Sequence, residues 1–100
     1  MVRDVDEGAM MNDPIAMGEQ LYCYARTNLV DESVAFDEQT PLDVAGIDSF
    51  CILELLLFSE RVFGVSVPES HLTQENLASL ASLARCLARL AGAGRSSALA

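Results

Sequence analysis

The sequence contains no lysine, one histidine and three cysteines, and no two of the cysteines form a Cys-x-x-Cys pair. His71 stands alone in a turn-forming stretch, and Cys23, Cys51 and Cys86 are widely spaced, so neither a metal site nor a disulfide framework is indicated. We expect reduced, mostly buried thiols in a cytoplasmic protein. The chain also lacks a constellation of nucleophile, base and orienting group, so we do not expect an enzyme.

Long apolar runs are also missing. The longest, residues 51–58, is interrupted by Glu54 and is too short to span a bilayer. Residues 1–12 are acidic and lack the apolar stretch of a signal peptide. We therefore expect no membrane association.

Positive charge is scarce and unevenly placed. Fifteen acids against six arginines give a formal net charge of −9, and no acid lies after residue 75, where Arg85, Arg89 and Arg95 are found. Such a chain repels phosphate backbones, so nucleic-acid binding is not expected and basic protein partners are favoured. Acidity also keeps a small hydrophobic domain soluble, and composition alone does not separate these two interpretations.

The chain does contain strong helical signals. Asp13 as N-cap and Pro14 as first helical residue predict a helix over residues 14–29. A second helix is predicted over residues 49–63, with Asp48 or Ser49 as its cap and with Gly64 as its left-handed stop.

The remaining segments complete an all-α prediction. A closing helix follows from leucines at helical spacing over residues 79–90, with Gly92 as its stop, and a short helix is predicted near residues 69–75. Residues 30–48 read as a long loop that is pinned to the core at several points. We predict a four-helix bundle of three main helices and one short helix, with the long loop between the first and second.

The same patterns divide the chain into three parts. Residues 1–12 are predicted to be a flexible leader, residues 13–91 a single domain, and residues 92–100 a loose, low-complexity tail. A monomer is the expected state.

The second predicted helix carries apolar residues on two sides. One side would face the core, with the stripe Ile52, Leu55, Leu56, Ser59 and Phe63. The other side holds three further apolar residues among charged ones: Phe50, Leu53 and Leu57, beside Glu54, Glu60 and Arg61. Because a small domain cannot easily bury a helix on all sides, we predict that this second side binds a partner.

Ser49 lies where that helix begins. A hydroxyl there faces unpaired N–H groups, and a phosphate attached to it would be stabilised. Taken alone, a serine at this place is more often a plain cap. Cys51 lies close to the same helix start, where the pKa of a thiol can fall, but no base lies nearby in the sequence, so we do not assign it as a nucleophile.

Three runs, in this order and at these spacings, carry a family resemblance: Gly46-Ile47-Asp48-Ser49-Phe50, then Phe63-Gly64-Val65-Ser66-Val67-Pro68, then Leu72-Thr73 with Glu75-Asn76-Leu77. They resemble the acyl and peptidyl carrier protein family, which has a G-x-D-S-[LMF] motif at the start of its second helix and an aromatic–Gly–aliphatic–x–aliphatic–Pro stretch about a dozen residues later. The similarity covers residues 14–90, and the stretch from Phe36 through Thr40-Pro41-Leu42 also fits.

The resemblance implies a carrier that catalyses nothing itself. A phosphopantetheinyl transferase would move 4′-phosphopantetheine from coenzyme A onto the hydroxyl of Ser49, and Asp48 would help that enzyme position its metal and substrate. The arm would hold an acyl or aminoacyl group as a thioester, received from a loading enzyme and passed to a downstream synthase or transferase. The docking candidates are then the residues of the second side: Phe50, Leu53, Glu54, Leu57, Glu60 and Arg61.

The sequence also departs from the family pattern. Phe50 replaces the commoner leucine, Cys51 and Arg61 stand where carriers of fatty-acid synthesis usually have acids, and Ser59 takes an apolar core position. These departures favour a specialised pathway (polyketide, nonribosomal peptide or single aminoacyl activation) and leave the cargo open. The alternative is an acidic helical adaptor that binds a partner through the same face, with Ser49 as a plain cap.

Overall fold

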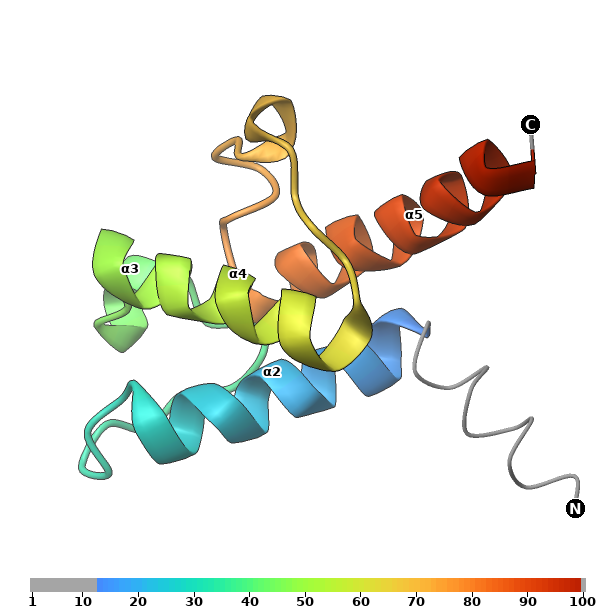
Figure 1. Cartoon of the computed structure of the whole chain (residues 1–100). Coiled ribbons are helices and arrows are strands. Elements are labelled where there is room, and N and C mark those ends of the chain that lie inside the picture. The colour runs from blue at the N-terminus through green and yellow to red at the C-terminus, as the bar shows by residue number, and fades with distance from the viewer. Residues whose placement is uncertain (1–12, 100) are drawn as a thin grey trace, which may run out of the picture.

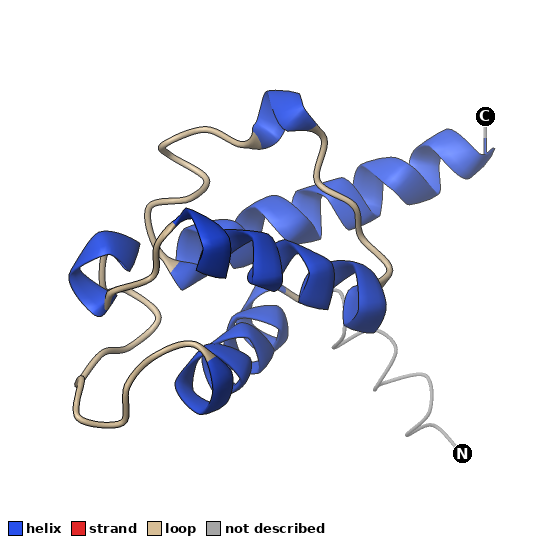
Figure 2. Cartoon of the chain, turned by 60° about the vertical axis from the view of Figure 1, so that its left-hand side comes forward, coloured by secondary structure: helices blue, strands red, loops and turns tan. Residues whose placement is uncertain are grey.

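Three helices make up most of the computed structural model, which describes residues 13–99: α2 (Pro14–Asn28), α4 (Ser49–Phe63) and α5 (Leu80–Leu99) (Figure 1). A one-turn helix, α3 (Leu42–Ala45), and a short 3-10 helix, η1 (Glu69–His71), lie in the two long connections on either side of α4 (Figure 2). No strand occurs within the described range. The all-α prediction is confirmed, whereas the predicted leader, residues 1–12, lies outside the described residues.

Capping residues fix the start of α2 and the end of α4, as the sequence predicts. The Asp13 carboxylate accepts a hydrogen bond from the Ile15 N–H at 3.1 Å, and Pro14 occupies the first helical position. After the last residue of α4, Gly64 is left-handed with φ of 70° and donates its N–H back to the last carbonyls of the helix. A residue with a Cβ rarely adopts this conformation, so glycine ends the helix here.

The predicted end of the last helix is wrong, because α5 continues through Gly92 to Leu99. The left-handed glycines of the described residues are Gly46 and Gly64, so Gly92 does not make the turn that a glycine stop requires. Alanines and leucines around Gly92 favour a helix, and they offset the cost of the two interior glycines, Gly92 and Gly94, about 1 kcal/mol each. The segment predicted as a tail, residues 92–100, is therefore helical up to Leu99; its flexibility stays a prediction.

Two smaller differences concern the connections. The short helix predicted near residues 69–75 spans only Glu69–His71, because the Thr73 hydroxyl accepts the Asn76 N–H at 3.2 Å and begins a separate turn. The helix α3 was not predicted, although Pro41 precedes it and Gly46, with φ of 85°, ends it.

The core lies between α2 and α5 and is covered by one side of α4. Its largest fully buried side chains come from all three helices: Met17, Leu21, Leu55, Ser59, Leu80, Leu83, Cys86 and Leu87. The rings of Tyr24 on α2 and Phe58 on α4 stack with their centroids 4.4 Å apart. α2 packs more extensively along α5 than against α4, so α2 and α5 form the base on which α4 rests.

The loop before α4 is held in place by hydrogen bonds and by a cation–π contact, as expected. The Arg26 guanidinium donates to the carbonyls of Val34 and Asp31 and lies over the Phe36 ring, 4.9 Å from its centroid. Further along, the Leu42 N–H donates to the Ala78 carbonyl at 3.0 Å, and the Ala81 N–H donates to the Glu38 carbonyl at 2.9 Å. These bonds fix the path of the chain that leads to Ser49.

Candidate functional site

The start of α4 is built by a short, well-defined turn. Gly46 reverses the chain after α3, and Ile47 is buried as an anchor. Asp48 is the N-cap: its backbone is extended, and its carboxylate accepts the Cys51 N–H at 3.0 Å. Ser49 is therefore the first residue of the helix, and the choice between Asp48 and Ser49 as cap is settled in favour of Asp48.

The Ser49 side chain is left free by this arrangement. It is exposed, and its hydroxyl forms no hydrogen bond with any residue that the structure describes. A plain cap would bond its oxygen to an N–H of the first turn, which Asp48 does instead. The hydroxyl thus stands at the positive end of a 15-residue helix and is accessible to a reagent from solvent.

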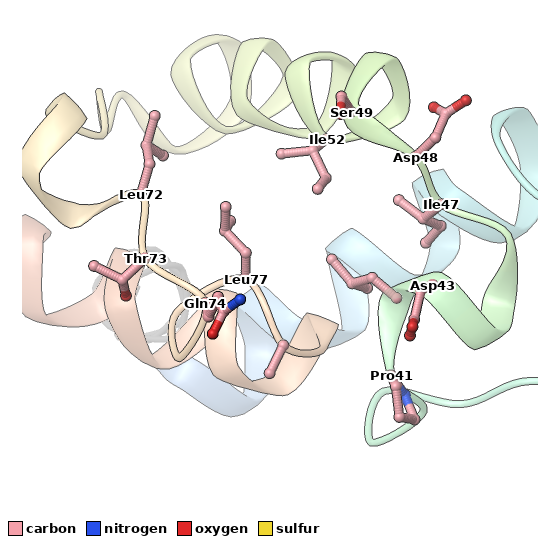
Figure 3. A pocket seen from close by; sticks show the side chains of 12 residues that line it. Pro41, Asp43, Ile47, Asp48, Ser49, Ile52, Leu72, Thr73, Gln74 and Leu77 are labelled. Atoms are coloured by element: carbon pink, nitrogen blue, oxygen red, sulfur yellow. The ribbon is translucent and has the colours of Figure 1, made fainter.

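Asp48 remains ionised next to this serine. Its hydrogen bond from the Cys51 N–H lowers the pKa of the Asp48 carboxyl below its usual value, because the bond stabilises the charged form. The carboxylate points away from the interior of the adjacent groove, as Figure 3 shows. It therefore offers a negative charge beside Ser49 without covering it.

A groove of about 630 Å³ runs from the start of α4 to the loop after η1. Ile47 and Ile52 line it on one side and Leu72 and Leu77 on the other, while Thr73 and Gln74 add polar atoms and Ser49 lies at its edge (Figure 3). Sequence reasoning missed this groove. It joins residues 41–52 to residues 72–78, and no local pattern reports that two such segments lie side by side.

Five of the six predicted docking residues are exposed on the outer side of α4, and the sixth, Glu54, is half-buried. Phe50, Leu53 and Leu57 are 67%, 52% and 45% exposed, and three exposed apolar side chains on one side of a helix form the kind of patch that binds partners. Glu60 and Arg61 are exposed as well. The structure therefore brings these five residues together on the outer side of α4. We call the side chains of Phe50, Leu53 and Leu57 the apolar face.

Glu54, the sixth predicted docking residue, lies at the margin of this group. It is half-buried, and its Oε1 accepts a hydrogen bond from the Tyr24 hydroxyl at 3.3 Å. An additional exposed residue was not predicted: Val44 projects from α3, which lies beside the first turn of α4 (Figure 1). The sequence offered only the short run after Pro41 as a sign of the helix that exposes Val44, and this run is too short to show helical periodicity.

Cys51 and Ser59 have ordinary structural roles. Burial raises the pKa of the Cys51 thiol, and the nearby Asp48 raises it further, so the reactive thiolate is disfavoured. Ser59 is fully buried, but its hydroxyl donates to the Leu55 carbonyl at 2.9 Å, so its polarity is satisfied within the helix. Within residues 13–99, no cluster of histidine, cysteine and acidic side chains could hold a metal ion.

No model of a known protein family matches the chain, and no curated protein is similar to it in sequence. None of the helices in the described part is long and apolar enough to cross a membrane. The class that fold and site define is thus a small all-α domain with a free serine at a helix start, an adjoining groove and an apolar face.

Proposed function

We propose that the chain is a carrier protein of the acyl and peptidyl carrier type, with 4′-phosphopantetheine attached to Ser49. One observation carries the proposal: the Ser49 hydroxyl is exposed and unbonded at the first residue of α4, because the preceding Asp48 takes over the capping role. Because Asp48 caps the helix, a capping role does not account for the serine at position 49.

The surroundings of Ser49 fit a phosphate ester and a long arm. The N–H groups of the first turn and the helix dipole favour a negative group on this hydroxyl. Asp48 opposes it in charge, but its carboxylate points out of the groove (Figure 3) and already accepts the Cys51 N–H. The groove that starts at Ser49 offers Ile52 and Leu72 as apolar surface for an arm or its cargo.

Attachment would be a phosphoryl-type transfer catalysed by a phosphopantetheinyl transferase. The Ser49 oxygen forms a bond to the phosphorus that bears pantetheine, the phosphoanhydride bond of coenzyme A breaks, and adenosine 3′,5′-bisphosphate leaves. The serine proton passes to a base of the transferase, since no base of this chain bonds to Ser49 within the described residues. The bound group would supply a thiol that carries an acyl or aminoacyl cargo as a thioester.

The apolar face on the outer side of α4 gives partner enzymes a surface to recognise. Burying three large apolar side chains contributes about 1.5–3 kcal/mol each when burial is complete, so even partial cover stabilises a complex. Glu60 and Arg61 flank this face with charges of both signs. Arg61 would repel a strongly basic partner, and it stands where carriers of fatty-acid synthesis usually have an acid. We therefore place the carrier in a specialised pathway (polyketide, nonribosomal peptide or aminoacyl transfer). We expect that pathway to be cytoplasmic.

Intact-protein mass spectrometry tests the proposal. The folded chain is incubated with coenzyme A and a broad-specificity phosphopantetheinyl transferase, and we expect a mass gain of one phosphopantetheine. Ser49→Ala should show no gain. Ser70→Ala, which removes an exposed hydroxyl in η1, should gain the full mass and serves as the matched control.

The adaptor function is the second candidate, and the exposure of Phe50, Leu53 and Leu57 favours it independently of Ser49. An adaptor would bind one partner through the apolar face and carry no arm. A wild-type chain that is folded yet gains no mass would refute the carrier proposal and leave the adaptor.

A further inference from the structure

Two arginines on α5 line a polar pocket that the proposed carrier role does not use. The pocket has a volume of about 310 Å³ and is lined by Glu75, Asn76, Ser82, Arg85 and Arg89. Four of its five lining residues lie after residue 75, where the sequence has arginines and no acids. The chain has a net charge of −9 and only six arginines, yet two of them lie together in this pocket.

Both guanidinium groups bond to neutral side chains. Arg85 donates to the Ser82 hydroxyl at 3.3 Å, and Arg89 donates to the Asn76 Oδ1 at 3.2 Å. Neither forms an ion pair with a carboxylate among residues 13–99. Each guanidinium has five N–H donors, so most of its bonding capacity remains available for an anion.

The neutral partners are themselves held in place. The Asn76 Nδ2 donates to the His71 carbonyl at 2.8 Å, and the Asn76 N–H donates to the Thr73 hydroxyl at 3.2 Å. On α5, the Ser82 N–H donates to the Ser79 hydroxyl at 3.2 Å. The guanidinium groups are thus oriented before any ligand arrives, which reduces the entropy lost on binding.

We propose that Asn76, Ser82, Arg85 and Arg89 form a carboxylate-binding site, which takes a single Glu or Asp side chain from an otherwise uncharged segment of a partner protein. Two guanidinium charges against the single carboxylate of Glu75 leave one net positive charge in the pocket, which matches a monoanion. A polyanion such as a nucleic acid would be repelled by the rest of the chain. The site does not depend on an arm at Ser49, so it is independent of the proposed function.

The test is a titration of the ¹⁵N-labelled full chain with a short peptide that carries one Glu among uncharged residues, followed by amide chemical shifts. We expect saturable shifts centred on Asn76, Ser82, Arg85 and Arg89, and the same peptide with Gln in place of that Glu should give none. The double variant Arg85→Gln/Arg89→Gln should raise the dissociation constant about tenfold, the effect of losing two exposed charge-assisted contacts. Both side chains are exposed, so the variant should remain folded.

Gln20→Glu is the matched control, since it makes the net charge more negative, as the loss of an arginine does, at an exposed position on α2 outside the pocket. It should leave the dissociation constant for the peptide unchanged. An equal loss in Gln20→Glu and the double variant, shifts centred elsewhere, or no binding would each overturn the proposal. Inorganic phosphate is titrated at matched ionic strength, and tighter binding of phosphate than of the peptide would overturn the assignment to carboxylates.

Discussion

The helices α4 and α5 are both rich in leucine, yet they use it in different ways. On α5, Leu80, Leu83 and Leu87 are completely buried, and arginines occupy the outer side. On α4, Leu55 is completely buried, whereas Leu53 and Leu57 are about half exposed. The neighbours of a helix, and not its hydrophobicity alone, therefore decide which of its apolar residues are buried.

The difference has a simple geometric origin. α5 packs along α2, and its apolar residues form a single stripe that this contact covers. α4 has apolar residues on two sides, and within the described part of the chain no other helix covers its outer side (Figures 1 and 2). The leucines of α5 therefore serve the core, whereas α4 divides its leucines between the core and an exposed surface.

The largest expected difference in the free energy of unfolding is between two leucine-to-alanine variants, one on α5 and one on α4. Leu83→Ala on α5 should lower the free energy of unfolding by about 3 kcal/mol, because it leaves a cavity in the core. Leu53→Ala on α4 should change it by about 0.5 kcal/mol or less, because that side chain is half exposed. Urea unfolding of both variants measures the contrast.

A large loss in Leu53→Ala would mean that the outer side of α4 is covered in the folded protein. Similar losses in both variants would then remove the distinction between the two helices.

The second contrast exchanges glycine for alanine on or beside each helix. Gly64→Ala should lower the free energy of unfolding by about 1–2 kcal/mol, because alanine must adopt a left-handed conformation there. Gly92→Ala should instead raise helicity and add up to about 1 kcal/mol, since it lies within α5 and, apart from the adjacent backbone of its own helix, nothing lies within 4 Å of a new Cβ. Circular dichroism and urea unfolding report both changes. A loss of helicity in Gly92→Ala would show that α5 ends at this glycine.

The smallest expected effect concerns the caps of the two helices. α4 begins with an ionisable cap, Asp48, whereas the first turn of α5 is bonded by the neutral Ser79. The pKa of Asp48 is lowered in the folded state, so its contribution to stability is complete above its usual pKa of 3.8 and is lost as the pH falls through the lower folded value.

Asp48→Asn keeps a good capping side chain but cannot titrate. Its stability should therefore fall less steeply than that of the wild type below about pH 4, and the two should be close at neutral pH. Urea unfolding at a series of pH values measures the two slopes. Equal slopes would show that the charge of Asp48 does not contribute to the capping of α4.

The parts of the fold that were predictable have local chemical signals. Asp13 with Pro14, and Gly64, mark helix ends by capping rules that act within a few residues. Gly92 misled the prediction, because a glycine stops a helix only if its backbone turns left-handed, and the residue type alone does not fix that conformation. The one-turn helix α3 was not predicted, because four residues are too few to show the hydrophobic periodicity of a helix.

The candidate site was predictable only in part. The position of Ser49 at a helix start, and the apolar side that bears Phe50, follow from motif and spacing. That Asp48 takes the cap and frees the serine depends on backbone angles that the sequence leaves open. The half-burial of Glu54 depends on Tyr24, which is distant in the sequence. The groove and the pocket of Arg85 and Arg89 likewise join separate segments.

The two backbone hydrogen bonds between the long loop and the start of α5 have a consequence for motion. Leu42 and Ala78, which are joined by one of them, both line the groove, and the bond from Ala81 to Glu38 lies close by in the chain. Because residues 41–52 and residues 72–78 form the two sides of the groove, the bond between Leu42 and Ala78 joins these sides at one end. Widening the groove at this end requires that bond to break, which is slower than the nanosecond reorientation of an exposed side chain such as Leu72. A molecule that enters the groove thus meets two sides held at a set separation at this end, and side chains at the rim that adapt to it.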